Sequence, residues 1–99
     1  MSFDAIKHVT ILGRVQGVGY RAWTADDART RHLQGWVRNR RGGSVEAVFA
    51  GGAEFVDAMI AACRKGPSMA RVEAVDVNDA TADELALRGS ATFAMLPTL

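Results

Sequence analysis

Apolar and polar residues alternate along several short segments of the chain, which is the pattern of half-buried β-strands. In residues 7–13, KHVTILG, this alternation places Val9 and Ile11 on one face of a predicted strand. Residues 34–39 and 44–50 flank the sequence RRGG and predict a β-hairpin. The remaining predicted strands are residues 70–78 and 91–96.

Two longer segments carry helical patterns. Residues 53–65, AEFVDAMIAACRK, have acidic residues in the first turn, one apolar stripe, and a Gly-Pro pair directly after the last turn. Residues 20–31, YRAWTADDARTR, contain no glycine or proline and predict a less amphipathic helix. The sequence TADEL at 81–85 matches a capping box and predicts a single helical turn. The apolar stripe of the clearer helix consists of Phe55, Val56, Met59, Ile60 and Cys63.

The order of these elements is βαββαβ with a short extra strand, which is typical of the ferredoxin-like (split βαβ) α+β fold. We expect an antiparallel sheet with two helices on one face. The chain of 99 residues fits a single domain, residues 1–99. Fold alone does not assign a function, because many activities share this scaffold.

Composition limits the partners and the location of the protein. Hydrophobic residues make up 48% of the chain and the net charge is +1, without the basic excess of a typical nucleic-acid binder. The single cysteine, Cys63, excludes an internal disulfide framework and fits a reducing compartment. The start lacks the apolar core of a signal peptide, and the longest apolar run, 58–63, is too short to span a bilayer. We expect a cytoplasmic monomer that binds no membrane.

The stretch GRVQGVGYR at 13–21 combines three glycines with two arginines after the first predicted strand. Gly17 and Gly19 permit positive φ angles and close approach of a ligand to the backbone. Successive N–H groups that converge at the start of a helix bind anions. Arg21 can grip two phosphate oxygens with its planar guanidinium. The loop therefore suits a small phosphate compound, but by itself the same pattern also fits a plain glycine turn with a surface arginine.

Two other ligands fit this loop less well. Residues 17–22 match the dinucleotide pattern G-x-G-x-x-G/A, but a hairpin follows where a second βαβ unit is required. RNA-recognition domains share the predicted element order, yet the two central strands offer only Phe49 for base stacking. The cluster Arg38, Arg40 and Arg41 fits a solvated hairpin end better than a row of phosphate contacts. We therefore expect no nucleic-acid partner.

The motifs GRVQGVGYR at 13–21 and GWVRNRRGGSVE at 35–46 resemble those of the acylphosphatases, and the similarity extends over residues 6–96. The resemblance implies a metal-independent hydrolase without a cofactor, which cleaves the carboxyl-phosphate bond of acyl phosphates to a carboxylate and inorganic phosphate. It places the essential arginine on Arg21 and a water-orienting asparagine on Asn39. It places the phosphate-binding loop on Gln16, Gly17, Val18, Gly19, Tyr20 and Arg21.

Three features depart from the family's usual pattern. Tyr20 stands where phenylalanine is more usual, and Gly42-Gly43 replaces an Asp-Gly turn. The final FAML segment, 93–96, lacks the basic or aromatic finish often seen.

The residue types in the two motifs favour the same reaction on chemical grounds. Phosphoryl transfer needs mainly positioning and charge stabilisation, which Arg21 and the loop amides supply. The Asn39 carboxamide can orient a water molecule but cannot act as a general base. Apart from Glu46, beyond the turn, neither motif contains an acidic residue, histidine or cysteine. Such a site suits a carboxylate leaving group, whose conjugate acid has a pKa of about 4, rather than an alkoxide.

Other candidate residues favour structural roles. Cys63 lies on an apolar helix stripe, and Trp23 and Trp36 suit packing better than base stacking. His8 and His32 have no cysteine or carboxylate at metal-ligand spacing, so we expect no metal site. The alternative to the enzyme is a non-catalytic module of the same fold that binds phosphate or nucleic acid.

Overall fold

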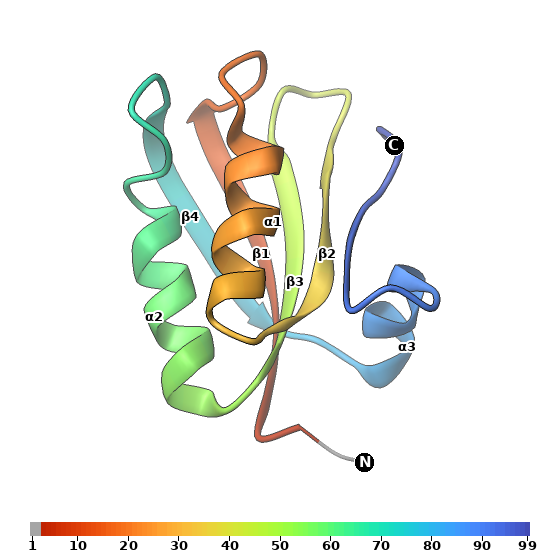
Figure 1. Cartoon of the computed structure of the whole chain (residues 1–99). Helices are drawn as coiled ribbons and strands as arrows, with labels where there is room; N and C mark the ends of the chain where they lie inside the picture. Colours follow the sequence, from red (N-terminus) through yellow and green to blue (C-terminus); the bar gives the residue numbers. More distant parts are fainter. Residues whose placement is uncertain (1–2) are drawn as a thin grey trace.

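The computed structural model describes residues 3–99, which form one five-stranded sheet with two helices on one face (Figure 1). The element order confirms the predicted ferredoxin-like fold and its short extra strand. The strands are β1 (Ala5–Arg14), β2 (Gln34–Asn39), β3 (Val45–Gly51), β4 (Arg71–Asp79) and β5 (Phe93–Met95). The helices are α1 (Tyr20–Thr30), α2 (Ala53–Cys63) and the single turn α3 (Ala82–Leu85), which the 3₁₀ turn η1 (Ala86–Arg88) continues.

The sheet is mixed rather than wholly antiparallel. Its strand order is β4-β1-β3-β2-β5. The pairs β1–β3, β1–β4 and β2–β3 are antiparallel, whereas β2–β5 is parallel. The chain leaves β4 at the end of the sheet where β2 begins, and it crosses to the opposite edge through α3 (Figure 1). It therefore enters β5 in the direction of β2.

The main core lies between the sheet and helices α1 and α2. Val9 and Ile11 are fully buried there, as the alternation of β1 predicts. Phe49 of β3 stacks on Phe93 of β5, with ring centroids 5.9 Å apart, and this contact anchors the short edge strand. Cys63 is buried, and burial raises the pKa of its thiol to about 12, so it is an inert core residue.

The sequence prediction is wrong for one residue of the α2 stripe. The four positions spaced i, i+3, i+4 and i+7 are buried, but Phe55 is 54% exposed. Phe55 precedes the first of these positions by one residue, which turns its side chain about 100° away from the core side of the helix. Its ring lies beside the backbone of Gly52 instead. The buried positions are Val56, Met59, Ile60 and Cys63.

A smaller cluster covers part of the opposite sheet face. Trp36 is almost fully buried beneath α3, and its indole Nε1 donates a hydrogen bond of 2.8 Å to the Glu84 carbonyl. Thr81 and Glu84 form the predicted capping box at the start of α3. The packing role predicted for Trp36 is therefore confirmed. Within residues 3–99, no helix is long and apolar enough to cross a membrane.

Candidate active site

A cleft of about 140 Å³ lies at the end of the sheet that carries the β1–α1 loop and the β2–β3 hairpin (Figure 1). It brings together residues from the loop, the first turn of α1, the end of β2 and the end of β5. The two predicted catalytic residues, Arg21 and Asn39, therefore line one cleft although they come from different elements. The lining residues are Val15, Gln16, Gly17, Gly19, Tyr20, Arg21, Ala22, Asn39 and Met95.

The β1–α1 loop has the backbone conformation of an anion site. Gly17 and Gly19 have φ angles of 74° and 79°, in the left-handed region that favours glycine. Gly19 caps α1 without a side-chain hydrogen bond, and the first turn of α1 contains no acidic residue. The N–H groups of this turn and the positive end of the helix dipole are thus left for a ligand.

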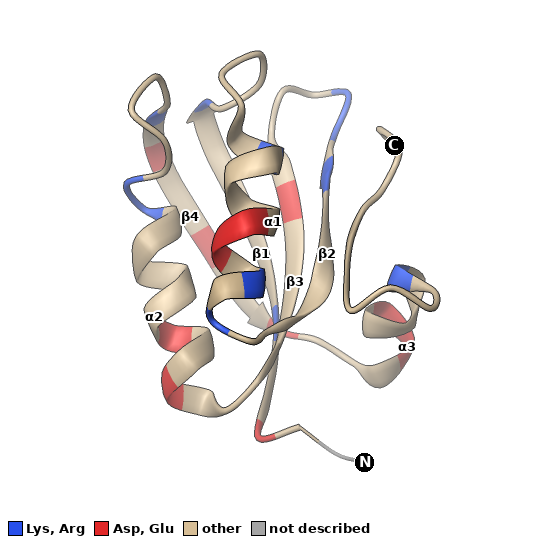
Figure 2. Ribbon diagram, in the orientation of Figure 1, with Lys and Arg blue, Asp and Glu red and all other residues tan. Residues whose placement is uncertain are grey.

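Arg21 lies in that first turn and is partly exposed. The two aspartates of α1 pair with other arginines: Asp26 lies 3.7 Å from Arg29, and Asp27 lies 2.9 Å from Arg31. Figure 2 shows these acidic positions farther along α1, away from the loop. Among the residues that line the cleft, Arg21 is the only charged one. Its guanidinium is therefore available to an anion.

Asn39 is the last residue of β2 and pairs with Val45 of β3. Its carboxamide Oδ1 is buried and has no hydrogen-bond partner within the described residues 3–99. Its backbone carbonyl accepts a hydrogen bond of 3.1 Å from the N–H of Leu99, which holds the end of the strand. An unpartnered buried acceptor costs roughly 1–3 kcal/mol, and such a group in a cleft is typical of a functional site.

The side chain of Gln16 has a structural role. Its Nε2 donates hydrogen bonds of 2.7 and 2.8 Å to the carbonyls of Arg40 and Ser44. These bonds join the β1–α1 loop to the β2–β3 hairpin and so fix the two sides of the cleft relative to each other. Of the N–H groups of Gln16, only the backbone one is therefore left for phosphate. Nothing in the sequence spacing indicates the side-chain hydrogen bonds to the hairpin.

Two other loop residues point into the protein. The Val18 side chain packs against the main core and does not line the cleft. The Tyr20 hydroxyl donates a hydrogen bond of 2.6 Å to the Cys63 carbonyl, so it joins the start of α1 to the end of α2. Conversely, the structure adds three apolar lining residues that the motif analysis did not single out: Val15, Ala22 and Met95.

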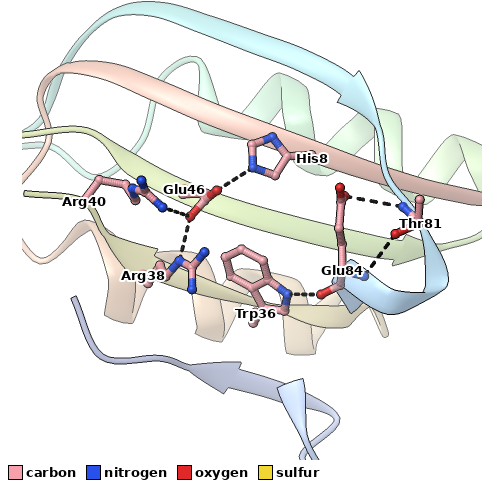
Figure 3. Close-up of polar contacts among 7 residues, drawn as sticks. All are labelled: His8, Trp36, Arg38, Arg40, Glu46, Thr81 and Glu84. Atoms are coloured by element: carbon pink, nitrogen blue, oxygen red, sulfur yellow. Dashed lines mark hydrogen bonds and ion pairs between the residues drawn. The ribbon is translucent and has the colours of Figure 1, made fainter. Parts of the chain in front are cut away.

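A polar network that includes β2, the strand of Asn39, lies on the sheet face that carries α3. Glu46 of β3 bonds His8 of β1 and the Nε of Arg38, each at 2.6 Å, and Arg40 at 3.4 Å (Figure 3). Arg38 also lies 4.6 Å from the centroid of the Trp36 ring. The prediction of a solvated cluster is thus wrong for Arg38, because Glu46 lies opposite it across the hairpin. Within residues 3–99, no group of potential ligands could hold a metal ion.

The Glu46 network makes stability depend on pH. Burial alone would raise the pKa of Glu46, but hydrogen bonds from His8 and Arg38 outweigh it and hold the pKa below its ordinary value. A lowered folded-state pKa stabilises the fold above the unfolded pKa of about 4.3, and this contribution is lost as pH falls through the folded value. We expect Glu46→Gln to destabilise the protein by about 1–3 kcal/mol near pH 7, measured by urea unfolding.

This destabilisation should be smaller at an acidic pH below the lowered folded-state pKa of Glu46, where the wild-type carboxyl is protonated, than near pH 7. The matched control is Asp79→Asn, which removes the exposed ion pair with Lys7 on the neighbouring strand pair. We expect little change in stability from that variant. An effect of Glu46→Gln that stays equal at both pH values would contradict the role of this carboxylate.

Comparison with known proteins identifies the family of the chain. The family model described as Acylphosphatase matches residues 7–93. An acylphosphatase from Rhodopseudomonas palustris is 57% identical, over 97% of this chain and 98% of its own length. One from Bradyrhizobium diazoefficiens is 55% identical, over 96% of this chain and 97% of its own length. The crystal structure of the acylphosphatase from Bacillus subtilis superposes with a TM-score of 0.81 at 30% identity, over 92% of this chain and 97% of that one. The chain therefore belongs to the acylphosphatase family and has acylphosphatase activity, the hydrolysis of acyl phosphates to a carboxylate and inorganic phosphate.

Proposed function

We propose that the hydrolysis occurs by in-line attack of water on the phosphorus atom, with the phosphoryl group held by Arg21 and the backbone N–H groups of residues 16–21. One observation carries this proposal: within residues 3–99, a cleft lined by a guanidinium without a protein partner is also lined by an asparagine whose buried Oδ1 has none. The first group suits an anion and the second suits a water molecule.

Arg21 and the loop amides stabilise the charge of the transition state. That charge is spread over the three equatorial oxygens of the phosphoryl group. The planar guanidinium binds two of these oxygens, and the N–H groups at the start of α1 bind the remaining charge. Since these donors are fixed before the substrate arrives, the reaction needs no metal ion or other cofactor.

Asn39 orients the attacking water. Its carboxamide, which lines the cleft, forms a hydrogen bond with the water and so aims a lone pair of the water oxygen at phosphorus. A new P–O bond forms while the bond between phosphorus and the acyl oxygen breaks, and the electron pair leaves with the carboxylate. The proton of the water passes to a phosphate oxygen or to solvent, because a carboxamide cannot accept it. The carboxylate needs no proton, which favours acyl phosphates over phosphomonoesters.

The location, the oligomeric state and the substrates of this enzyme are proposed from the same residues. We propose a cytoplasmic monomer of one domain, since one chain supplies the whole cleft and the only cysteine is buried. Small acyl phosphates, such as acetyl, carbamoyl or glycerate acyl phosphates, fit the proposed chemistry. Nucleic acid is not an expected partner: Phe49, the aromatic residue of the two central strands, is fully buried.

Hydrolysis in ¹⁸O-labelled water tests the mechanism. We expect release of phosphate from acetyl phosphate at the same rate with and without EDTA, with the label in the phosphate. We expect no release from glycerol phosphate, whose alkoxide leaving group would require a general acid. Label in the acetate would show attack at the carbonyl carbon and overturn the proposal. Loss of turnover in EDTA, restored by a divalent cation, would contradict metal independence.

A further inference from the structure

The cleft holds an apolar side chain that neither the phosphate nor the attacking water uses. Met95, the last residue of β5, lines the cleft and is 46% exposed. Met95 pairs with Val37, two residues before Asn39 on β2, so Met95 and Asn39 lie near each other at the same end of the sheet. A phosphorylated ligand bound in this cleft therefore has Met95 beside the residue proposed to orient the attacking water.

The backbone that carries Met95 is held firmly. Met95 pairs with Val37 of β2, and the N–H of Leu96 donates a hydrogen bond of 2.9 Å to the Val37 carbonyl. Phe93, two residues earlier, is buried in the core, and its carbonyl accepts a hydrogen bond from Arg29. Only the flexible thioether side chain of Met95 is free to adapt, which is the property that suits methionine to ligand surfaces of varied shape.

The charges of the cleft limit what this surface can bind. Its lining contains one cation, Arg21, and no carboxylate. Once Arg21 is bound to the phosphate, a second anionic group on the ligand would lose water without gaining a charged partner, which is unfavourable. The exposed apolar side chain in this lining is that of Met95, whereas Val15 is buried in the core.

We propose that Met95 contacts the acyl group and makes the enzyme select apolar acyl phosphates over those with a second negative charge. This inference rests on the proposed binding of the phosphate at Arg21 and the loop. Met95 is a specificity-determining residue and takes no part in the transfer of the phosphoryl group.

The test compares kcat/KM for benzoyl, acetyl and succinyl phosphate. We expect benzoyl phosphate to be the best substrate and succinyl phosphate, with its additional carboxylate, the poorest. Met95→Ala should lower kcat/KM for benzoyl phosphate about tenfold, the scale of a lost apolar contact in a pocket, and should change the value for acetyl phosphate less than about threefold. Met95→Lys should raise kcat/KM for succinyl phosphate relative to kcat/KM for benzoyl phosphate. Inhibition by inorganic phosphate should stay unchanged in Met95→Ala.

The matched control is Met69→Ala, because Met69 is also exposed, at 67%, but lies outside the cleft. This control should leave all three values unchanged. A parallel loss with every substrate in Met95→Ala, accompanied by weaker inhibition by phosphate, would overturn the acyl contact.

Calorimetric binding of benzoylphosphonate and acetylphosphonate separates this inference from the proposed mechanism. These analogues cannot be hydrolysed, so they report binding alone. Selective weakening of benzoylphosphonate by Met95→Ala supports the acyl contact even if the proposed mechanism fails. If Met95→Ala binds each of the two analogues with the same affinity as the wild type, the acyl contact is overturned even if the mechanism holds.

Discussion

Arg21→Ala is expected to lower kcat/KM for acetyl phosphate by at least about 10²-fold, the scale of losing a main donor to a transition-state oxyanion. The reason lies in the composition of the cleft, which has no second cation to replace the guanidinium. Initial rates of phosphate release give the measurement. Arg21→Lys should be nearly as damaging, because an ammonium group cannot reproduce two parallel hydrogen bonds.

The matched control for this prediction is Arg31→Ala. Arg31 follows α1 at its other end and pairs with Asp27, so the variant removes the same charge from the same helix without touching the cleft. We expect its rate within a factor of about two of the wild type, since surface ion pairs contribute little. Added guanidinium ion should partly restore Arg21→Ala and leave Arg31→Ala unchanged. Near-normal turnover in Arg21→Ala would show that the loop amides alone hold the phosphate, and near-normal turnover in Arg21→Lys would show that a single positive charge without the bidentate geometry is enough.

The backbone conformation of the proposed phosphate loop could be predicted from the sequence because its determinants are local. Gly17 and Gly19 follow a strand and precede a helix, so backbone conformation and residue order together indicate an anion site. Both glycines adopt positive φ angles in the structure. The capping box at Thr81 is predictable for the same reason, since it depends on residues three positions apart.

Contacts between distant segments could not be predicted in this way. His8 has no carboxylate near it in the sequence, yet the β1–β3 pairing brings Glu46 to it. Gln16 lies in the phosphate motif, yet its side chain binds carbonyls of the hairpin. Both partners are fixed by strand register, which one sequence specifies only through the whole fold. Met95 joins the cleft for a similar reason, because β5 reaches it only through the parallel pairing with β2.

Asn39→Ala is expected to lower kcat by about 10²-fold for acetyl phosphate, whereas the inhibition constant for inorganic phosphate should change less than about threefold. The carboxamide is proposed to contact the attacking water, which is aimed at phosphorus only in the transition state, so its loss affects turnover and spares binding. Equal losses in kcat and in phosphate affinity would instead place Asn39 in the phosphate site. Asn78→Ala is the matched control, because Asn78 is an exposed asparagine of β4.

Stability gives a second readout of Asn39→Ala that separates function from folding. Among residues 3–99 the wild-type Oδ1 has no hydrogen-bond partner although it is buried, and removing such a group relieves a cost of roughly 1–3 kcal/mol. The variant should therefore unfold at an equal or higher temperature than the wild type while its kcat falls. A gain in stability with a loss of kcat is expected of a catalytic residue, since active sites contain polar groups that lower the stability of the fold. A lower melting temperature together with a proportional loss of activity would show that Asn39 supports the end of β2 and does not orient water.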